Sequence, residues 1–188
     1  MADKDMDGTL LDLSDRGLTK LEIPSGENPT ALIADRNSIT RVENVEQCPH
    51  LRQLSLKSNR LVHMNGVGKL RHLTVLNLPQ NSIVAIEGVR ELTELTWLNL
   101  SGNSIKMMEN LSNNFNLRHL DLSDNSISQL GDIHHLNNLK TLLLHGNIIT
   151  TLKTAPHFLP KTISIFSLAE NEIADINENV RLVILVNS

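Results

Sequence analysis

The chain has 188 residues, of which 40% are hydrophobic, and a formal net charge of -4 from 17 Lys and Arg against 21 Asp and Glu. This length and composition fit one globular domain, and without a basic excess the counterion release that drives most nucleic-acid binding is missing. Only 2% of the residues are aromatic, too few for a base-stacking or sugar-stacking platform, so neither nucleic acid nor carbohydrate is expected as a partner.

The first segment, residues 1–9, is acidic and lacks the apolar stretch of a signal peptide. No run of about 18 apolar residues occurs in the sequence, so no membrane-spanning segment is predicted. Cys48 is the only cysteine, which excludes a disulfide within the chain and favours a reducing, intracellular compartment.

Two chemical motifs overlap in the acidic segment. Asp5 and Asp7 stand in DMDGT, which matches the first motif of haloacid-dehalogenase phosphatases. That chemistry needs its Asp pair at the end of a buried strand, whereas only four residues precede Asp5 in this chain. The spacing from Asp3 also resembles the start of a calcium loop, yet its twelfth position is Ser14 rather than Glu. We interpret both motifs as chance matches and predict that the chain is not an enzyme.

From Leu10 onward the sequence repeats the pattern LxxLxLxxNxL. Its Asn position recurs every 22 residues, lengthening to 24 before the last, at Asn37, Asn59, Asn81, Asn103, Asn125, Asn147 and Asn171. Leucines at period two before each Asn, such as Leu54 and Leu56, predict a short strand. The looser apolar spacing after each Asn favours a short helix or 3₁₀ segment.

No single repeat can bury its leucines alone, so consecutive repeats are expected to stack around one core. The predicted fold is an α/β right-handed leucine-rich-repeat solenoid with a concave parallel β-sheet and short helical or 3₁₀ convex segments. It is expected over residues 10–178, as a degenerate cap repeat followed by seven repeats. The seven Asn are interpreted as a structural ladder, because an amide can both donate to and accept from the backbone groups that each turn leaves unpaired.

Three places depart from the regular pattern. The cap repeat carries Arg16 at the Asn position. The last repeat is two residues longer, and there Pro156 and Pro160 are expected to exclude a regular helix and to make the convex loop bulge. Residues 179–188 form a divergent C-terminal end without a visible cap.

Side chains that alternate with the buried leucines form columns on the concave face. Trp97, the only tryptophan, falls in one of them, and a tryptophan framed by polar residues has the composition of an interface anchor with its rim. The alternative is a tryptophan that packs over its neighbours without any ligand. The candidate partner-binding residues are Val75, Trp97, His119, Asn77, Asn99, Asp121, Lys57 and His145. A second candidate is the convex segment 153–161.

No metal or cofactor site is predicted. The eight histidines lack the partner spacing that a metal site needs; they are His50, His63, His72, His119, His134, His135, His145 and His157. The sequence also contains no phosphate-binding glycine loop and no nucleophile elbow.

The repeat spacing, with segments such as NSIVAIEGVREL, resembles the SDS22-like class of intracellular leucine-rich repeats. Longer segments are similar to the amino-terminal repeats of the ninety-seven-kilodalton family of vertebrate centrosomal proteins, which combine leucine-rich repeats with an IQ domain. These segments are LTVLNLPQNSI, LRHLDLSDNSISQLGDI, LKTLLLHGNIITTL and APHFLPKTISIFSLAENEIADINE. The likeness covers about residues 10–178.

The resemblance implies a scaffold in the cytoplasm and cytoskeleton, at the centrosome and centriole. It also implies a partner, the one-hundred-and-ten-kilodalton centriolar coiled-coil protein, with which the family caps centrioles and restrains primary cilium assembly. The family's calmodulin-binding IQ motif lies beyond the repeats, so calmodulin is not expected to bind this chain. The alternative is an SDS22-like regulatory subunit that binds a protein phosphatase.

Overall fold

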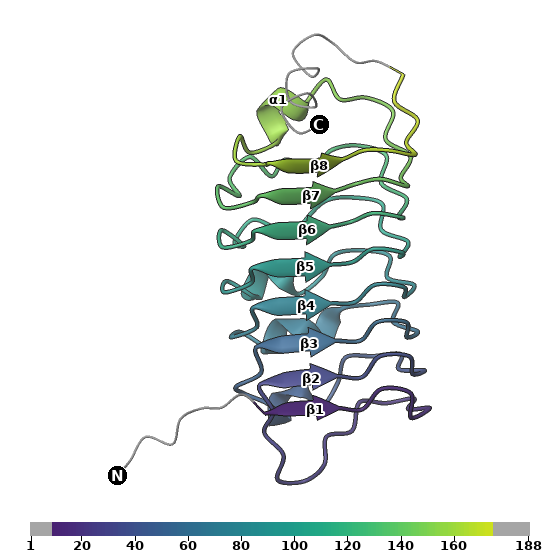
Figure 1. The fold of residues 1–188 in the computed structure, drawn as a ribbon, viewed down its shortest axis with the longest axis vertical. Coiled ribbons are helices and arrows are strands. Elements are labelled where there is room, and N and C mark those ends of the chain that lie inside the picture. The colour runs from purple at the N-terminus through teal and green to yellow at the C-terminus, as the bar shows by residue number, and fades with distance from the viewer. Residues whose placement is uncertain (1–8, 175–188) are drawn as a thin grey trace, which may run out of the picture.

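The computed structural model describes residues 9–174, in which eight parallel strands stack in chain order into one sheet (Figure 1). The strands are β1 (Leu10–Asp12), β2 (Ala31–Ile33), β3 (Gln53–Ser55), β4 (Val75–Asn77), β5 (Trp97–Asn99), β6 (His119–Asp121), β7 (Thr141–Leu143) and β8 (Ile165–Ser167). The candidate residues Asp5 and Asp7 and the divergent C-terminal end lie outside the described residues. The solenoid with a parallel sheet that the repeat predicts is confirmed.

The return segments lie behind the sheet in the view of Figure 1. Three of them contain a 3₁₀ helix, namely η1 (Val45–Gln47), η2 (Asn65–Lys69) and η3 (Val89–Glu91). The repeats between η3 and residue 154 return through turns. In the part of the chain that the structure describes, no helix is long and apolar enough to cross a membrane.

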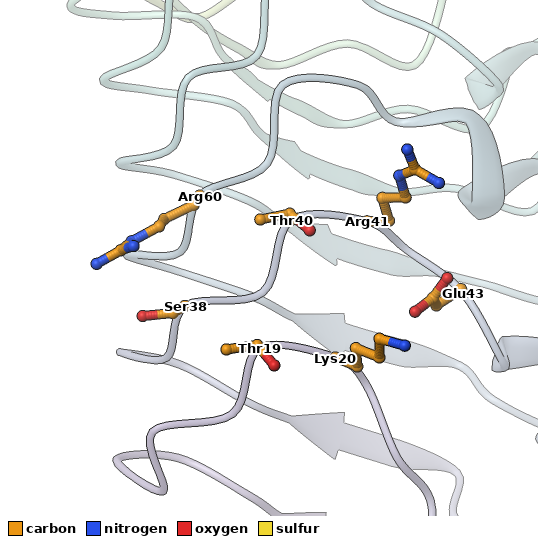
Figure 2. A pocket seen from close by; sticks show the side chains of 7 residues that line it. All are labelled: Thr19, Lys20, Ser38, Thr40, Arg41, Glu43 and Arg60. Atoms are coloured by element: carbon orange, nitrogen blue, oxygen red, sulfur yellow. The ribbon is translucent and has the colours of Figure 1, made fainter.

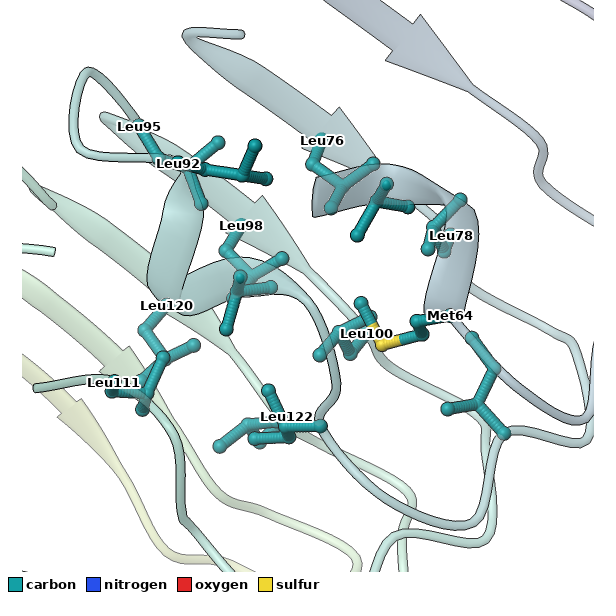
Figure 3. Packing of buried hydrophobic residues seen from close by; sticks show 14 of the residues in the cluster. Met64, Leu76, Leu78, Leu92, Leu95, Leu98, Leu100, Leu111, Leu120 and Leu122 are labelled. Carbon is teal, nitrogen blue, oxygen red and sulfur yellow. The ribbon is translucent and has the colours of Figure 1, made fainter. Parts of the chain in front are cut away.

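The constant repeat length sets the register of the sheet, because it pairs equivalent positions of neighbouring strands. Leu76, Leu98 and Leu120 are consecutive Cα partners at the centres of β4, β5 and β6. All three are fully buried. Figure 3 shows them packed with residues of the return segments, among them Met64 and Leu111.

The repeated asparagines join each turn to the repeat before it. Nδ2 of Asn103 donates to the carbonyls of Leu78, Leu100 and Ser101 at 3.1, 2.9 and 3.2 Å, and its Oδ1 accepts the N–H of Ile83 at 3.0 Å. The other repeated asparagines form the same hydrogen bonds: Nδ2 donates to three carbonyls, and Oδ1 accepts an N–H of the preceding turn. They are Asn37, Asn59, Asn81, Asn125, Asn147 and Asn171. The side chains thus satisfy backbone groups that a turn would otherwise leave unpaired.

Asparagines outside the repeat consensus form hydrogen bonds to the backbone on the convex side. Asn114 occupies an inward position where the preceding repeat has Leu92, and it is fully buried. Its Nδ2 donates to the carbonyls of Val89 and Leu92, both at 2.9 Å. Its Oδ1 has no hydrogen-bond partner among residues 9–174.

The two-residue insertion in the last repeat contains α1 (Ala155–Phe158), at the C-terminal end of the ladder in Figure 1. The expectation that the prolines exclude a regular helix is therefore wrong. Pro156 lies in the first turn of α1, where its missing N–H would have had no partner within the helix. Pro160 follows the end of the helix and does not interrupt it.

Candidate functional site

The register brings six of the eight candidate residues together on the concave face of β4, β5 and β6. Val75, Trp97 and His119 are consecutive Cα partners in one column, and Asn77, Asn99 and Asp121 are partners in the next. Because the strands are about 4.8 Å apart, neighbouring side chains in a column touch.

Lys57 and His145 lie apart from these six. Each comes two residues after the end of a strand, Lys57 after β3 and His145 after β7. The Lys57 N–H donates to Oδ1 of Asp35 at 2.9 Å, and Nδ1 of His145 lies 3.3 Å from the hydroxyl oxygen of Ser167. Six residues therefore form one cluster, and Lys57 and His145 flank it.

Trp97 and His119 form a stacked aromatic pair. Their ring centroids are 3.6 Å apart and the ring planes differ by 7°. Trp97 remains 42% exposed, so the stack fixes the indole without covering it. A large side chain that is already immobile loses little conformational entropy when a partner binds, which is the property of an interface anchor.

The polar column beside the stack is partly engaged in local turns. Oδ1 of Asn99 accepts the N–H and hydroxyl of Ser101 at 2.9 and 2.8 Å. Oδ1 of Asp121 accepts the same two groups of Ser123 at 3.0 and 2.6 Å. The Nδ2 of Asn99 and the Oδ2 of Asp121 have no hydrogen-bond partner within residues 9–174. The Nδ2 of Asn99 is thus a free donor, and the neighbouring Oδ2 of Asp121 is a free acceptor.

Burial against the sheet lowers the pKa of His119 below its ordinary value, and the Asp121 carboxylate only partly opposes this effect. The residues paired with His119 on the adjacent strands, Trp97 and Thr141, are uncharged. The imidazole is therefore neutral at pH 7 and gains its proton only in more acidic solution.

This depressed pKa predicts a pH-dependent fluorescence signal. Because Trp97 is the only tryptophan and an imidazolium in contact quenches indole emission, we expect the fluorescence to fall as His119 becomes protonated. The midpoint should lie below about 6.5, the ordinary histidine value. A fluorescence titration of the intact chain measures it, and His119→Gln should abolish the transition. A midpoint above the ordinary value would contradict this account.

The second candidate surface, residues 153–161, contributes several side chains to the core. Ala155 and Leu159 are buried there, and the carbonyl of Phe158 accepts the N–H of Ile133 at 2.8 Å. These contacts give the segment a structural role and leave the concave face as the stronger candidate.

A depression on the flank of the first repeats, of about 420 Å³, was not marked by any motif. It is lined by Thr19, Lys20, Ser38, Thr40, Arg41, Glu43 and Arg60 (Figure 2). Figure 2 shows the cationic side chains of Lys20, Arg41 and Arg60 pointing in different directions. They do not converge on one position, as the groups of a built anion site would. In the sequence, an alignment of the repeats at their Asn positions would have shown that the residues following each Asn share this surface.

No three His, Cys, Asp or Glu side chains within residues 9–174 are placed to hold a metal ion. Cys48 is a buried free thiol, and burial raises its pKa.

Two family models match the chain, one described as leucine rich repeat over residues 49–105 and one as leucine rich repeats (2 copies) over residues 115–160. The chain is a leucine-rich-repeat protein. Together the two matches span more than half of it, and both fall within the described sheet.

Two solved leucine-rich-repeat structures from Listeria monocytogenes share its fold. Internalin C2 aligns with a TM-score of 0.69 at 22% identity, covering 80% of this chain and 66% of that chain. The functional domain of InlJ aligns with a TM-score of 0.58 at 24% identity, covering 81% and 37%. At these identities the likeness shows the fold alone.

Among curated proteins, the centrosomal protein of 97 kDa from Xenopus laevis is 51% identical over 54 residues. The match spans 28% of this chain and 7% of that protein, so it is narrower than the likeness over residues 10–178 expected from the repeats. It relates this leucine-rich-repeat protein to a centrosomal one, which is consistent with a protein-binding scaffold.

Proposed function

We propose that this leucine-rich-repeat chain is a non-enzymatic scaffold module that binds a protein partner through the concave face around Trp97. The observation that carries the proposal is the close stacking of Trp97 on His119, which leaves Trp97 42% exposed. A stiff sheet holds this anchor beside the free polar groups of Asn99 and Asp121. Repeat proteins commonly use such extended surfaces for binding.

We propose in addition that the module acts at the centrosome and centriole. Its partner is then the one-hundred-and-ten-kilodalton centriolar coiled-coil protein, with which it caps centrioles and restrains primary cilium assembly. The similarity to the Xenopus centrosomal protein supports this part of the proposal. The site and the cellular role rest on different observations, and one experiment can test both.

The experiment is affinity purification from ciliated cells, read out by mass spectrometry. We expect the intact chain to recover centriolar proteins and the Trp97→Ala, His119→Ala double variant to lose them. Trp97→Ala should cost less than the about 3 to 5 kcal/mol of truncating a fully buried tryptophan, because Trp97 is 42% exposed and loses only its aromatic contact and a partly buried area. Circular dichroism and thermal unfolding check that both proteins are folded.

The chain offers a matched control in a second aromatic pair, Phe115 with His135. Phe115 is 54% exposed and lies edge-on to His135, with ring centroids 5.9 Å apart, outside the concave face. The Phe115→Ala, His135→Ala variant should retain the partners. Recovery by the Trp97 variant would place the interface elsewhere, and recovery of a phosphatase catalytic subunit in place of centriolar proteins would favour the SDS22-like alternative.

A further inference from the structure

The residues that directly precede the strands, with their neighbours, form a rim at the amino-terminal ends of the strands. The charge of this rim changes along the stack. Before β3, Arg52 lies 3.4 Å from a carboxylate oxygen of Glu94, and Nδ1 of His72 lies 2.9 Å from the other oxygen. Thr74 and Thr96 precede β4 and β5. The rim is therefore neutralised internally over these repeats.

The next two repeats place cations on this rim without a counterion among residues 9–174. Arg118 precedes β6 and Lys140 precedes β7, and both side chains are exposed. Neither forms an ion pair with another residue of the described chain. The Lys140 N–H donates to the Arg118 carbonyl at 2.8 Å, so the two residues are direct neighbours across the sheet.

The carboxylate that pairs with Arg52 has no counterpart here. The positions equivalent to Glu94 in the following three repeats are Asn116, Asn138 and Thr162. The two Nδ2 groups donate to the carbonyls of Thr93 and Phe115 at 2.9 and 2.8 Å, and the Thr162 hydroxyl donates to the Leu139 carbonyl at 2.9 Å. Asp121 lies at the opposite end of β6 from Arg118. A local positive rim thus borders the Trp97 and His119 stack in a chain whose net charge is -4.

We infer that the concave face binds an acidic protein segment. An apolar side chain of that segment packs on Trp97, and its carboxylates lie against Arg118 and Lys140. The three strands β5 to β7 span about 10 Å between their axes, a distance that a few residues of one segment can cover. Arg118 can bind a carboxylate in bidentate fashion, whereas Lys140 supplies a point charge. The inference rests on the proposed binding face and adds the chemistry of its partner.

The test uses the intact chain and Trp97 fluorescence, which reports directly from the site. The probes are synthetic peptides of identical length that place two leucines among glutamates, among glutamines or among lysines. We expect the glutamate peptide to bind at least about tenfold more tightly than the other two, a ratio that two close ion pairs can supply. Its affinity should fall as ionic strength rises.

Charge reversal of the rim provides the decisive comparison. Arg118→Glu, Lys140→Glu should weaken binding of the glutamate peptide at least about tenfold. The matched control is Arg90→Glu, Lys106→Glu, which reverses the same charge at two exposed positions on η3 and on the flank, and it should leave the affinity unchanged. Thermal unfolding checks that both variants fold.

Several results would overturn the inference. They are equal affinity for the glutamine peptide, an unchanged affinity after charge reversal, no binding of any peptide, or equally tight binding of a single-stranded oligonucleotide. The proposed function would survive each of them, because it stands on partner capture through Trp97 and His119. The reverse result is also distinguishable. If the Trp97→Ala, His119→Ala variant captured the same partners as the intact chain, while the intact chain still bound the glutamate peptide selectively, the proposed function would be overturned and the peptide preference would stand.

Discussion

Replacing Leu120 with alanine should lower the free energy of unfolding by about 2 to 5 kcal/mol. Leu120 is fully buried at the centre of β6, where Leu98 and Leu142 are its Cα partners. The truncation therefore opens a cavity that two neighbouring repeats share. Because each repeat of a solenoid is stabilised by its neighbours, a defect in the middle weakens both halves of the stack. Urea-induced unfolding followed by circular dichroism measures the change.

The matched control for this truncation is Leu143→Ala. Leu143 is a leucine of the adjacent strand β7, but it points to the concave face and is only partly buried. Its loss removes less apolar area from the protein interior, so the effect should be clearly smaller. A change below about 1 kcal/mol for Leu120→Ala would mean that the buried face of the strands has been assigned incorrectly.

The repeat length made the sheet and its register predictable. A period of 22 residues fixes which positions are equivalent, and equivalent positions pair in a stack of identical turns. The alternation of side chains then predicts that Trp97 lies beside His119 on the concave face. For the same reason the polar column with Asn99 and Asp121 follows from counting alone.

Features that depend on side-chain rotation or on departures from the consensus could not be predicted in this way. The near-parallel stacking of Trp97 and His119 requires particular rotamers of both rings. The ion pair between Arg52 and Glu94 joins residues 42 positions apart, two repeats along the stack. The α1 turn forms although Pro156 lies within it, because the position of a proline in a helix decides its effect.

Replacing Asn125 with alanine should lower the free energy of unfolding by about 2 to 4 kcal/mol. Its Oδ1 accepts the N–H of Ile105 at 2.9 Å, and its Nδ2 donates to the carbonyls of Leu100, Leu122 and Ser123. The substitution leaves the buried Ile105 N–H without this acceptor. Equilibrium unfolding in urea measures the loss. Asn116→Ala, which removes an exposed bond to the Thr93 carbonyl, should cost less than about 1 kcal/mol.

Asn125→Asp separates the donor and acceptor roles of this side chain. Aspartate keeps an oxygen for the Ile105 N–H, but an ionised carboxylate cannot donate to the three carbonyls and is repelled by them. Its pKa should therefore be raised in the folded state, so folding takes up a proton as the solution becomes acidic. We expect the stability of this variant, relative to the parent chain, to increase as the pH falls from about 7 to about 5. A pH-independent difference would show that the three donated bonds contribute little, and that the acceptor alone explains why asparagine occupies the turn.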